Sequence, residues 1–257
     1  MKIFEHRQRL ATILAGACTI WLLAQPAAAQ FGGPPRPSGP AKDVAPIDVT
    51  GQWVSIVTED WRFRMLTPAK NDYPGLPLNA AARAVADAWD PARDEAEGNA
   101  CKSYGVGAIM RVPGRIRISW DDDSTLEIET DAGRQKRLLH FDGTAPEEME
   151  RTWQGNSKAE WILHAGERGR PPVNGTIKVV TTGMKAGYLR KNGVPYSEDA
   201  VVTEWYDLFT QHDGTQWLQI LTRIDDPTYF MTPVITSTNF RREADRRAWD
   251  PQPCMAQ

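Results

Sequence analysis

Hydrophobic and polar residues alternate along most of the chain, and the alternation is densest between residues 187 and 242. Where large apolar side chains occupy both alternating positions, as between residues 200 and 209, the pattern predicts a strand buried on both faces. Short runs of Gly, Asp and Pro interrupt the alternation and favour chain reversals. Pro233 falls inside the last run, where we expect a bulge or a sheet edge. The stretch therefore predicts three antiparallel strands at residues 200–209, 217–224 and 229–240.

The earlier part of the chain repeats this rhythm of short strands. Residues 53–58 and 61–67 predict a hairpin, and Asn79 is suited to cap a single short helix at residues 80–89, which Asp90-Pro91 would end. Strands spaced by about 8–12 residues predict an all-β fold, namely an antiparallel barrel with one inserted helix, and a β-sandwich is the alternative. The further strands expected are residues 109–112, 115–120, 126–130, 136–141, 149–153, 159–163 and 176–181.

The first 29 residues have the composition of a secretory signal peptide. Basic residues precede a mostly apolar run at residues 10–23, and small residues follow at 27–29. The run is short for a transmembrane helix, so we expect cleavage near Ala29 and a periplasmic or secreted protein. A lipoprotein signal ending at Cys18 is the alternative, and it would leave a much shorter apolar core.

The remaining chain divides into a leader and one domain. Residues 30–47 are rich in Pro and Gly and predict a disordered leader, whereas residues 48–257 predict a single β-barrel domain. The net charge is −3, with both signs spread along the chain. That distribution argues against nucleic acid and against an anionic membrane as partner. We expect no stable membrane insertion, and the sequence predicts no oligomeric state.

Two cysteines, Cys101 and Cys254, follow the predicted cleavage site. In an exported chain a pair of cysteines most simply forms one disulfide. A metal site or a catalytic thiol is the alternative, but neither cysteine has a second ligand residue clustered beside it.

Strong catalytic and metal-binding motifs are absent from the sequence. It contains no phosphate-binding glycine loop, no His-Glu-x-x-His, no Cys-x-x-Cys and no Gly-x-Ser-x-Gly. His140, His164 and His212 lie in different predicted strands or turns. We therefore expect no metal and no cofactor.

The segment at residues 187–197 is a candidate ligand-binding loop. It places Arg190 and Lys191 beside an Asn-Gly turn, and Tyr196 follows shortly after. Polar loops at the mouth of a barrel commonly orient ligands. The alternative is a plain surface loop held by the Asn-Gly turn.

Glu204 is the candidate catalytic residue. If the strand face that carries Val202 and Tyr206 points inward, Glu204 is a carboxylate in an apolar wall, and a raised pKa would suit it to acid–base chemistry. If that face points outward, Glu204 is an ordinary solvated side chain. Glu204, Trp205 and Tyr206 are also candidate ligand contacts.

Several motifs follow one another between about residues 95 and 254. They are Trp153-x-x-x-Ser157-x-x-x-Trp161, Gly175-x-Ile177-x-Val179-x-Thr181, Ser197-Glu198-x-x-x-x-Thr203-Glu204 and Asp225-Asp226-Pro227-x-x-x-x-x-Pro233. In this order, and with Cys254 paired to Cys101, they resemble an uncharacterised group of exported bacterial proteins. The resemblance implies an all-β secreted protein and carries no activity.

The opening of the predicted domain is similar to that of lipocalin-like (calycin) barrels. Gly51-x-Trp53 resembles their first-strand motif, and the resemblance implies that Arg241 or Arg242 packs across Trp53. The chain departs from that family in its greater length, in the inserted helix and in lacking an evident long C-terminal helix.

The ten Trp residues and the doubly apolar strands predict more aromatic surface than a thin sandwich needs. The preferred interpretation is therefore a periplasmic barrel that binds a small apolar or amphipathic molecule in an aromatic-lined cavity. One alternative is an enzyme of the same fold, a lyase, isomerase or hydrolase that uses Glu204 or an Asp/His pair in the barrel. Another is an envelope interaction protein, which a filled core with a large exposed apolar patch would favour.

Overall fold

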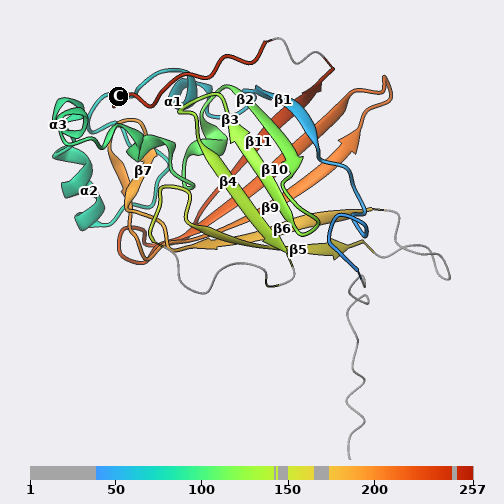
Figure 1. Cartoon of the computed structure of the whole chain (residues 1–257). Coiled ribbons are helices and arrows are strands. Elements are labelled where there is room, and N and C mark those ends of the chain that lie inside the picture. Colours follow the sequence, from blue (N-terminus) through green and yellow to red (C-terminus); the bar gives the residue numbers. More distant parts are fainter. Residues whose placement is uncertain (1–38, 142, 144–149, 165–173, 245–247, 257) are drawn as a thin grey trace, which may run out of the picture. The chain divides into compact units, whose positions relative to one another are not determined.

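Nine strands formed by the described residues (39–141, 143, 150–164, 174–244 and 248–256) pair in a closed ring, so that they form a β-barrel (Figure 1). This computed structural model confirms the all-β barrel predicted from the sequence. The predicted signal peptide, residues 1–29, lies outside the described residues. The neighbours around the ring are β1, β11, β10, β9, β6, β5, β4, β3 and β2. Their bounds are Gly51–Ile56 (β1), Arg115–Trp120 (β2), Thr125–Thr130 (β3), Lys136–Phe141 (β4), Asn156–Leu163 (β5), Gly175–Thr182 (β6), Val201–Thr210 (β9), Gln216–Asp225 (β10) and Val234–Glu243 (β11).

The barrel departs from the prediction in one strand pair. β4 and β5 run parallel, with Leu139 opposite Ser157 and Phe141 opposite Ala159, whereas the other pairs of the barrel are antiparallel. Parallel neighbours need a crossover connection instead of a hairpin. Turn residues mark where a chain reverses but not which strand it pairs with next, so the sequence pattern could not distinguish the two arrangements.

Two predicted strands are helices. Residues 61–67 do not complete a hairpin with β1, because Trp61–Met65 forms the helix α1. Residues 109–112 contain a short 3-10 helix, η2 (Ile109–Arg111). Over so few residues an apolar pattern fits both a strand and a helical turn.

The predicted helix is present, but it is not the only one. α2 (Ala80–Asp87) begins at Asn79, whose Oδ1 accepts a hydrogen bond from the Ala82 N–H at 2.9 Å. Asp90-Pro91 was expected only to end this helix, yet it also begins α3 (Pro91–Ala96). Asp90 Oδ1 accepts from the Ala92 N–H at 3.1 Å, and Pro91 occupies a first-turn position where its missing N–H has no consequence.

The stretch predicted to form three strands does so, with two corrections. β11 begins at Val234, after Pro233, instead of at residue 229, since Pro has no N–H to donate to a ladder. β9 is fully buried on one face only. Val202, Glu204 and Tyr206 point into the barrel with no exposed surface, while the opposite face is only half-buried or exposed.

The barrel interior is filled by side chains. Its residues belong to one hydrophobic cluster that joins strands from around the ring. Burial of each large apolar side chain of this kind stabilises a fold by about 1.5–3 kcal/mol. The largest fully buried side chains of this cluster are Trp53, Leu126, Ile128, Leu139, Phe141, Ile177, Tyr206, Leu218 and Phe240.

Trp53 joins β1 to the last strand at the barrel's seam. Its indole Nε1 donates to the Val49 carbonyl at 2.9 Å, and the Arg242 guanidinium lies 4.4 Å from the ring centroid. Arg242 also donates to the Asp48 carbonyl at 2.5 Å. A cation over an indole face is attracted by the negative face of the ring, so Arg242 is the arginine that packs across Trp53.

A second hydrophobic cluster covers the end of the barrel at which Val202 and Ile224 lie. It contains α2 and a hairpin made of β7 (Gly187–Arg190) and β8 (Val194–Tyr196), so the loop predicted at residues 187–197 is a buried hairpin. Tyr196, the last residue of β8, belongs to this second cluster and has no exposed surface. A side-chain carbon at Gly107 would come within 2.8 Å of the Tyr196 ring, so only Gly fits there.

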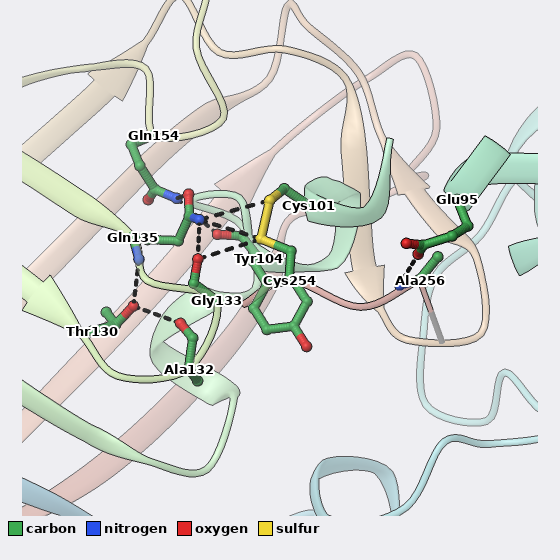
Figure 2. Close-up of a disulfide and its surroundings, with 10 residues drawn as sticks. All are labelled: Glu95, Cys101, Tyr104, Thr130, Ala132, Gly133, Gln135, Gln154, Cys254 and Ala256. Carbon is green, nitrogen blue, oxygen red and sulfur yellow. Dashed lines mark hydrogen bonds between the residues drawn. A yellow bond between two sulfur atoms is a disulfide. The ribbon is translucent and has the colours of Figure 1, made fainter. Parts of the chain in front are cut away.

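The predicted disulfide between Cys101 and Cys254 is present (Figure 2). Cys101 lies in the 3-10 helix η1 (Ala100–Tyr104), and Cys254 lies near the C-terminus. Gln135 Nε2 lies 3.3 Å from the Cys254 sulfur (Figure 2). The backbone N–H of Gln252, two residues before Cys254, donates to the Asp131 carbonyl at 2.8 Å. The disulfide therefore holds the C-terminal segment against the turn that follows β3.

The described part of the predicted leader, residues 39–47, contacts the barrel. Ala41 is buried, and its carbonyl accepts a hydrogen bond from Trp161 Nε1 at 3.0 Å. The Lys42 N–H donates to the Asp123 carbonyl at 3.0 Å. These contacts lie beside the aromatic stack of Trp161 and Phe141, whose centroids are 5.1 Å apart.

We predict that the double variant Cys101→Ser with Cys254→Ser lowers the free energy of unfolding by about 2–5 kcal/mol, because a disulfide that closes so long a loop restricts the unfolded chain. Urea denaturation of oxidised wild type and variant measures the difference. Reduced wild type should match the variant. An oxidised wild type no more stable than the variant would contradict a stabilising role.

Candidate functional site

The barrel wall has a notch where its first strand ends. β1 ends at Ile56, opposite Asn239, so β11 has no partner from β1 over its first residues, which pair with β10 alone. On the other side of the notch, Ser55 N–H donates to the Gly114 carbonyl just before β2 begins. α1 is the next element after β1, and its Arg64 donates to the Ser55 hydroxyl near the end of β1 at 3.0 Å.

A cleft of about 700 Å³ opens at this notch. Its volume lies within the range of ordinary small-molecule sites. α1, η2, β7 and the start of β11 all contribute to its lining, together with a loop that precedes α2. The lining residues are Asp60, Phe63, Pro74, Gly75, Leu76, Pro77, Arg111, Leu189, Arg190, Thr232, Pro233, Val234, Ile235 and Thr236.

Arg190 is the most buried cation of the cleft, with 8% of its surface exposed. Its guanidinium lies 4.2 Å from the centroid of the Phe63 ring, and Nη1 donates to the Pro74 carbonyl at 3.2 Å. Burial, and then the nearby charge of Arg111, lower the pKa of Arg190 against the opposing effect of Asp60. The guanidinium therefore occupies a site that would be stabilised by a further negative charge.

Arg111 is the second cation. Its Nη2 donates to Asp60 Oδ2 at 2.8 Å, but Nη1 is buried and has no hydrogen-bond partner. A buried donor without an acceptor costs about 1–3 kcal/mol. Asp60 is the one carboxylate among the described lining residues, and its side chain is 46% exposed. Within the described lining the two arginines share this one partly solvated carboxylate, and Asp72, outside the lining, also acts to raise the pKa of Arg190.

Exposed apolar side chains lie in the cleft and near it. Ile235 lines the cleft and is 63% exposed, and Trp61 of α1 is 64% exposed next to the lining residue Asp60. Met231 is 69% exposed, and its N–H donates to the carbonyl of Pro77 in the cleft wall at 2.8 Å. Exposed apolar side chains beside a cleft offer contact surface to a ligand or partner.

The structure separates the site residues predicted from the sequence. Arg190 lines the cleft, and Lys191 lies beside it on a small pocket that shares Phe63 and Arg111. Burial lowers the pKa of Lys191. Tyr196 is enclosed in the second hydrophobic cluster and cannot reach the cleft. Trp205 is on the outer face of β9, opposite Leu221 of β10.

Glu204 and Tyr206 lie inside the barrel with Arg137. Arg137 Nη2 donates to Glu204 Oε2 at 2.7 Å, and Nη1 donates to the Tyr206 hydroxyl at 3.3 Å. Ser157 and Thr181 accept from the same guanidinium. Burial alone would lower the pKa of Arg137, but the charges of Glu204 and Tyr206 outweigh it, so this pKa is raised. Burial and then Glu204 raise the pKa of Tyr206.

This network carries a charge pair in the filled interior. Glu204 has no exposed surface, and the described clefts do not include it in their linings. The face of β9 that carries it does point inward, which was one of the two orientations left open by the sequence. The arrangement gives Glu204 the chemistry of a structural counter-ion to Arg137.

Sequence reasoning missed Asp60, Phe63 and Arg111 as cleft residues. Asp60 falls between the two strands of the predicted hairpin, and Phe63 and Arg111 fall in segments that the sequence predicts as strands but that form helices. Residues 60–64 alternate charged and aromatic side chains, a period of two that favours a strand. That alternation did not show that the segment would face residues from the start of β11.

No protein-family profile, curated protein or solved structure matches this chain. The resemblances to exported bacterial proteins and to calycin barrels therefore stay predictions. Among the described residues, no helix is long and apolar enough to span a bilayer. In that same part of the chain, no three His, Cys, Asp or Glu residues come together as a metal site would require.

We predict that Glu204→Gln lowers the free energy of unfolding by about 3–5 kcal/mol, because it leaves the Arg137 guanidinium buried without its counter-charge. The double variant Arg137→Met with Glu204→Leu should recover most of this loss, since it removes both charges. Urea denaturation measures both.

Glu160→Gln is the matched control for this prediction. This substitution breaks the surface ion pair between Glu160, whose side chain is 48% exposed, and Lys178. It should lower the free energy of unfolding by at most about 1 kcal/mol. A Glu204→Gln protein as stable as the control would show that the pair is not structural.

Proposed function

We propose that this protein is an exported binding protein whose arginine-lined cleft holds a small amphipathic anion. The observation that carries the proposal is that two arginines, Arg111 and the largely buried Arg190, line one cleft whose described lining contains a single carboxylate, Asp60. An anionic group held against the two guanidiniums would balance the positive charge that Asp60 leaves over. Charge-assisted hydrogen bonds to arginine are among the strongest in proteins.

The apolar part of such a ligand has surfaces to contact. Phe63 and Leu189 line the cleft beside the arginines, and Ile235 exposes most of its side chain along one wall. A ligand with an anionic head and an apolar body would cover these side chains while its head pairs with the guanidiniums. This places binding on the flank of the barrel, because the interior is occupied by its own side chains.

The proposal includes export to the periplasm or beyond. It is supported by the composition of residues 1–29 and by the Cys101–Cys254 disulfide, a bond that persists in oxidising compartments and is rare in the cytosol.

We predict that decanoate binds the wild-type protein and that Arg190→Gln and Arg111→Gln each weaken binding by at least about tenfold. Each loses a charge-assisted hydrogen bond worth about 1.5–3 kcal/mol, and 1.4 kcal/mol corresponds to tenfold. Isothermal titration calorimetry at concentrations that do not form micelles measures the affinities.

The matched control for the decanoate titration is Arg83→Gln, which removes an exposed arginine of α2 outside the cleft lining and should leave the affinity unchanged. Decanol, which has the same apolar chain without the charge, should bind more weakly than decanoate. Equal decanoate affinities for wild type, Arg190→Gln and Arg111→Gln would refute the site, as would no binding at all.

We also predict that the protein recovered from the periplasm begins at residue 30 and lacks two hydrogens relative to the reduced chain. Intact-mass analysis before and after reduction measures both. An uncleaved N-terminus, or a mass unchanged by reduction, would argue against the export proposal.

A further inference from the structure

One wall of the cleft is the edge of a strand. Residues 234–236 at the start of β11 all line the cleft, although side chains of consecutive strand residues point to opposite faces. Consecutive residues can border one space only if that space runs along the strand's edge. The start of β11 pairs with β10 on one side, and β1 ends at Ile56, opposite Asn239, on the other. The backbone N–H and C=O groups on this open edge therefore face the cleft.

The facing wall is also a run of backbone. Residues 74–77 line the cleft together, and the chain then meets the other wall at the bridge between Leu78 and Phe230. Near this bridge the Met231 N–H donates to the Pro77 carbonyl at 2.8 Å. The two segments thus part from a hydrogen-bonded junction, and the cleft lies between them as a groove that is closed at one end.

The two arginines stand at the other end of the groove. Arg190 stacks on Phe63 of α1, and Arg111 pairs with Asp60, the residue that caps α1. The Arg111 carbonyl accepts from Arg64, which also donates to Ser55 near the end of β1. A short extended chain whose first residue lies next to the Leu78–Phe230 bridge, and which follows the edge of β11, therefore ends toward the guanidiniums.

We propose that the cleft binds the C-terminal end of an extended peptide, which adds as a strand to the open edge of β11 and places its terminal carboxylate against Arg111 and Arg190. The proposal rests on the proposed function, because it names the ligand class of the same cleft. The carboxylate of a peptide's last residue continues its backbone, so a strand laid along this edge delivers it directly to the end of the groove. The peptide runs parallel to β11, which leads from the bridge toward α1.

The dimensions and the chemistry of the walls agree with this ligand. The lining residues 232–236 match about four or five peptide residues at about 3.3 Å each. Backbone hydrogen bonds to a strand edge supply affinity, and pockets for alternate side chains supply specificity. The described lining of this cleft offers Phe63, Leu189 and Ile235 to such side chains, which favours apolar or β-branched residues.

The surroundings of the edge argue against a second copy of this chain as the occupant. Sheet-to-sheet pairing needs a flat, exposed edge. Here α1 stands at one end and residues 74–77 face the edge along its length, so one extended chain fits where a whole sheet does not. The arginines add a charge match that a carboxylate terminus satisfies.

The experiment uses two pools of random pentapeptides on the full mature protein, one with free carboxylates and one with C-terminal amides. Peptides retained by immobilised protein are identified by mass spectrometry. We expect enrichment from the carboxylate pool at least tenfold above the amide pool. Arg190→Gln and Arg111→Gln should each lose at least tenfold of this retention, whereas Arg83→Gln should keep it.

Hydrogen exchange distinguishes strand addition from carboxylate binding alone. An enriched peptide should slow amide exchange within residues 234–238 of the wild type, and decanoate should not, because only a peptide backbone can bond the open edge. This readout needs no variant, so a misfolded variant cannot hide the result.

Every other result overturns the inference. Equal enrichment from both pools, no enrichment, or an enriched peptide that leaves exchange at residues 234–238 unchanged would each do so. Decanoate binding that depends on the arginines would then still support the proposed function. Binding to phosphatidylglycerol vesicles in place of peptides would identify a lipid as the ligand, and failure of decanoate and peptides together would remove both proposals.

Discussion

β1, one of the two strands that close the barrel, is shorter than its neighbour β11. β1 has six residues and β11 has ten, so closure is complete only where Gln52–Ile56 faces Glu243–Asn239. Trp53 and Arg242 hold this closure from inside, through a cation over an indole ring and two hydrogen bonds to backbone carbonyls. Beyond Ile56 the wall is open, and the cleft, its arginines and its exposed strand edge all follow from that opening.

The filled interior and the open flank are related. Large aromatic and aliphatic side chains occupy the centre of the barrel, around a buried group of Arg137, Glu204 and their hydroxyl neighbours in which Arg137 Nε has no hydrogen-bond partner. Such a core rewards close packing and leaves little room for a ligand. The arginines that line a cleft, Arg111 and Arg190, lie instead on the flank of the barrel.

The hairpin β7–β8 forms part of the cleft wall through Leu189 and Arg190. It carries Arg190, and its turn is held by Asn192, whose Nδ2 donates to the carbonyls of Ala69 and Asp72. Gly193, at a φ of 82°, lies so close to Trp89 that a side chain there would collide with the ring. These contacts fix the guanidinium before any ligand arrives, and preorganised groups lose less entropy on binding.

The sequence by itself determined the all-β class, the capped helix after Asn79 and the Cys101–Cys254 pair, because alternation, capping and turn chemistry are local. Only the tertiary structure decided that β4 and β5 are parallel, that Glu204 meets Arg137, and that Asp60 and Arg111 join Arg190. Those outcomes depend on which distant segments become neighbours. The cleft itself arises from a difference in length between two strands far apart in the chain, and no local pattern encodes where one strand ends opposite another.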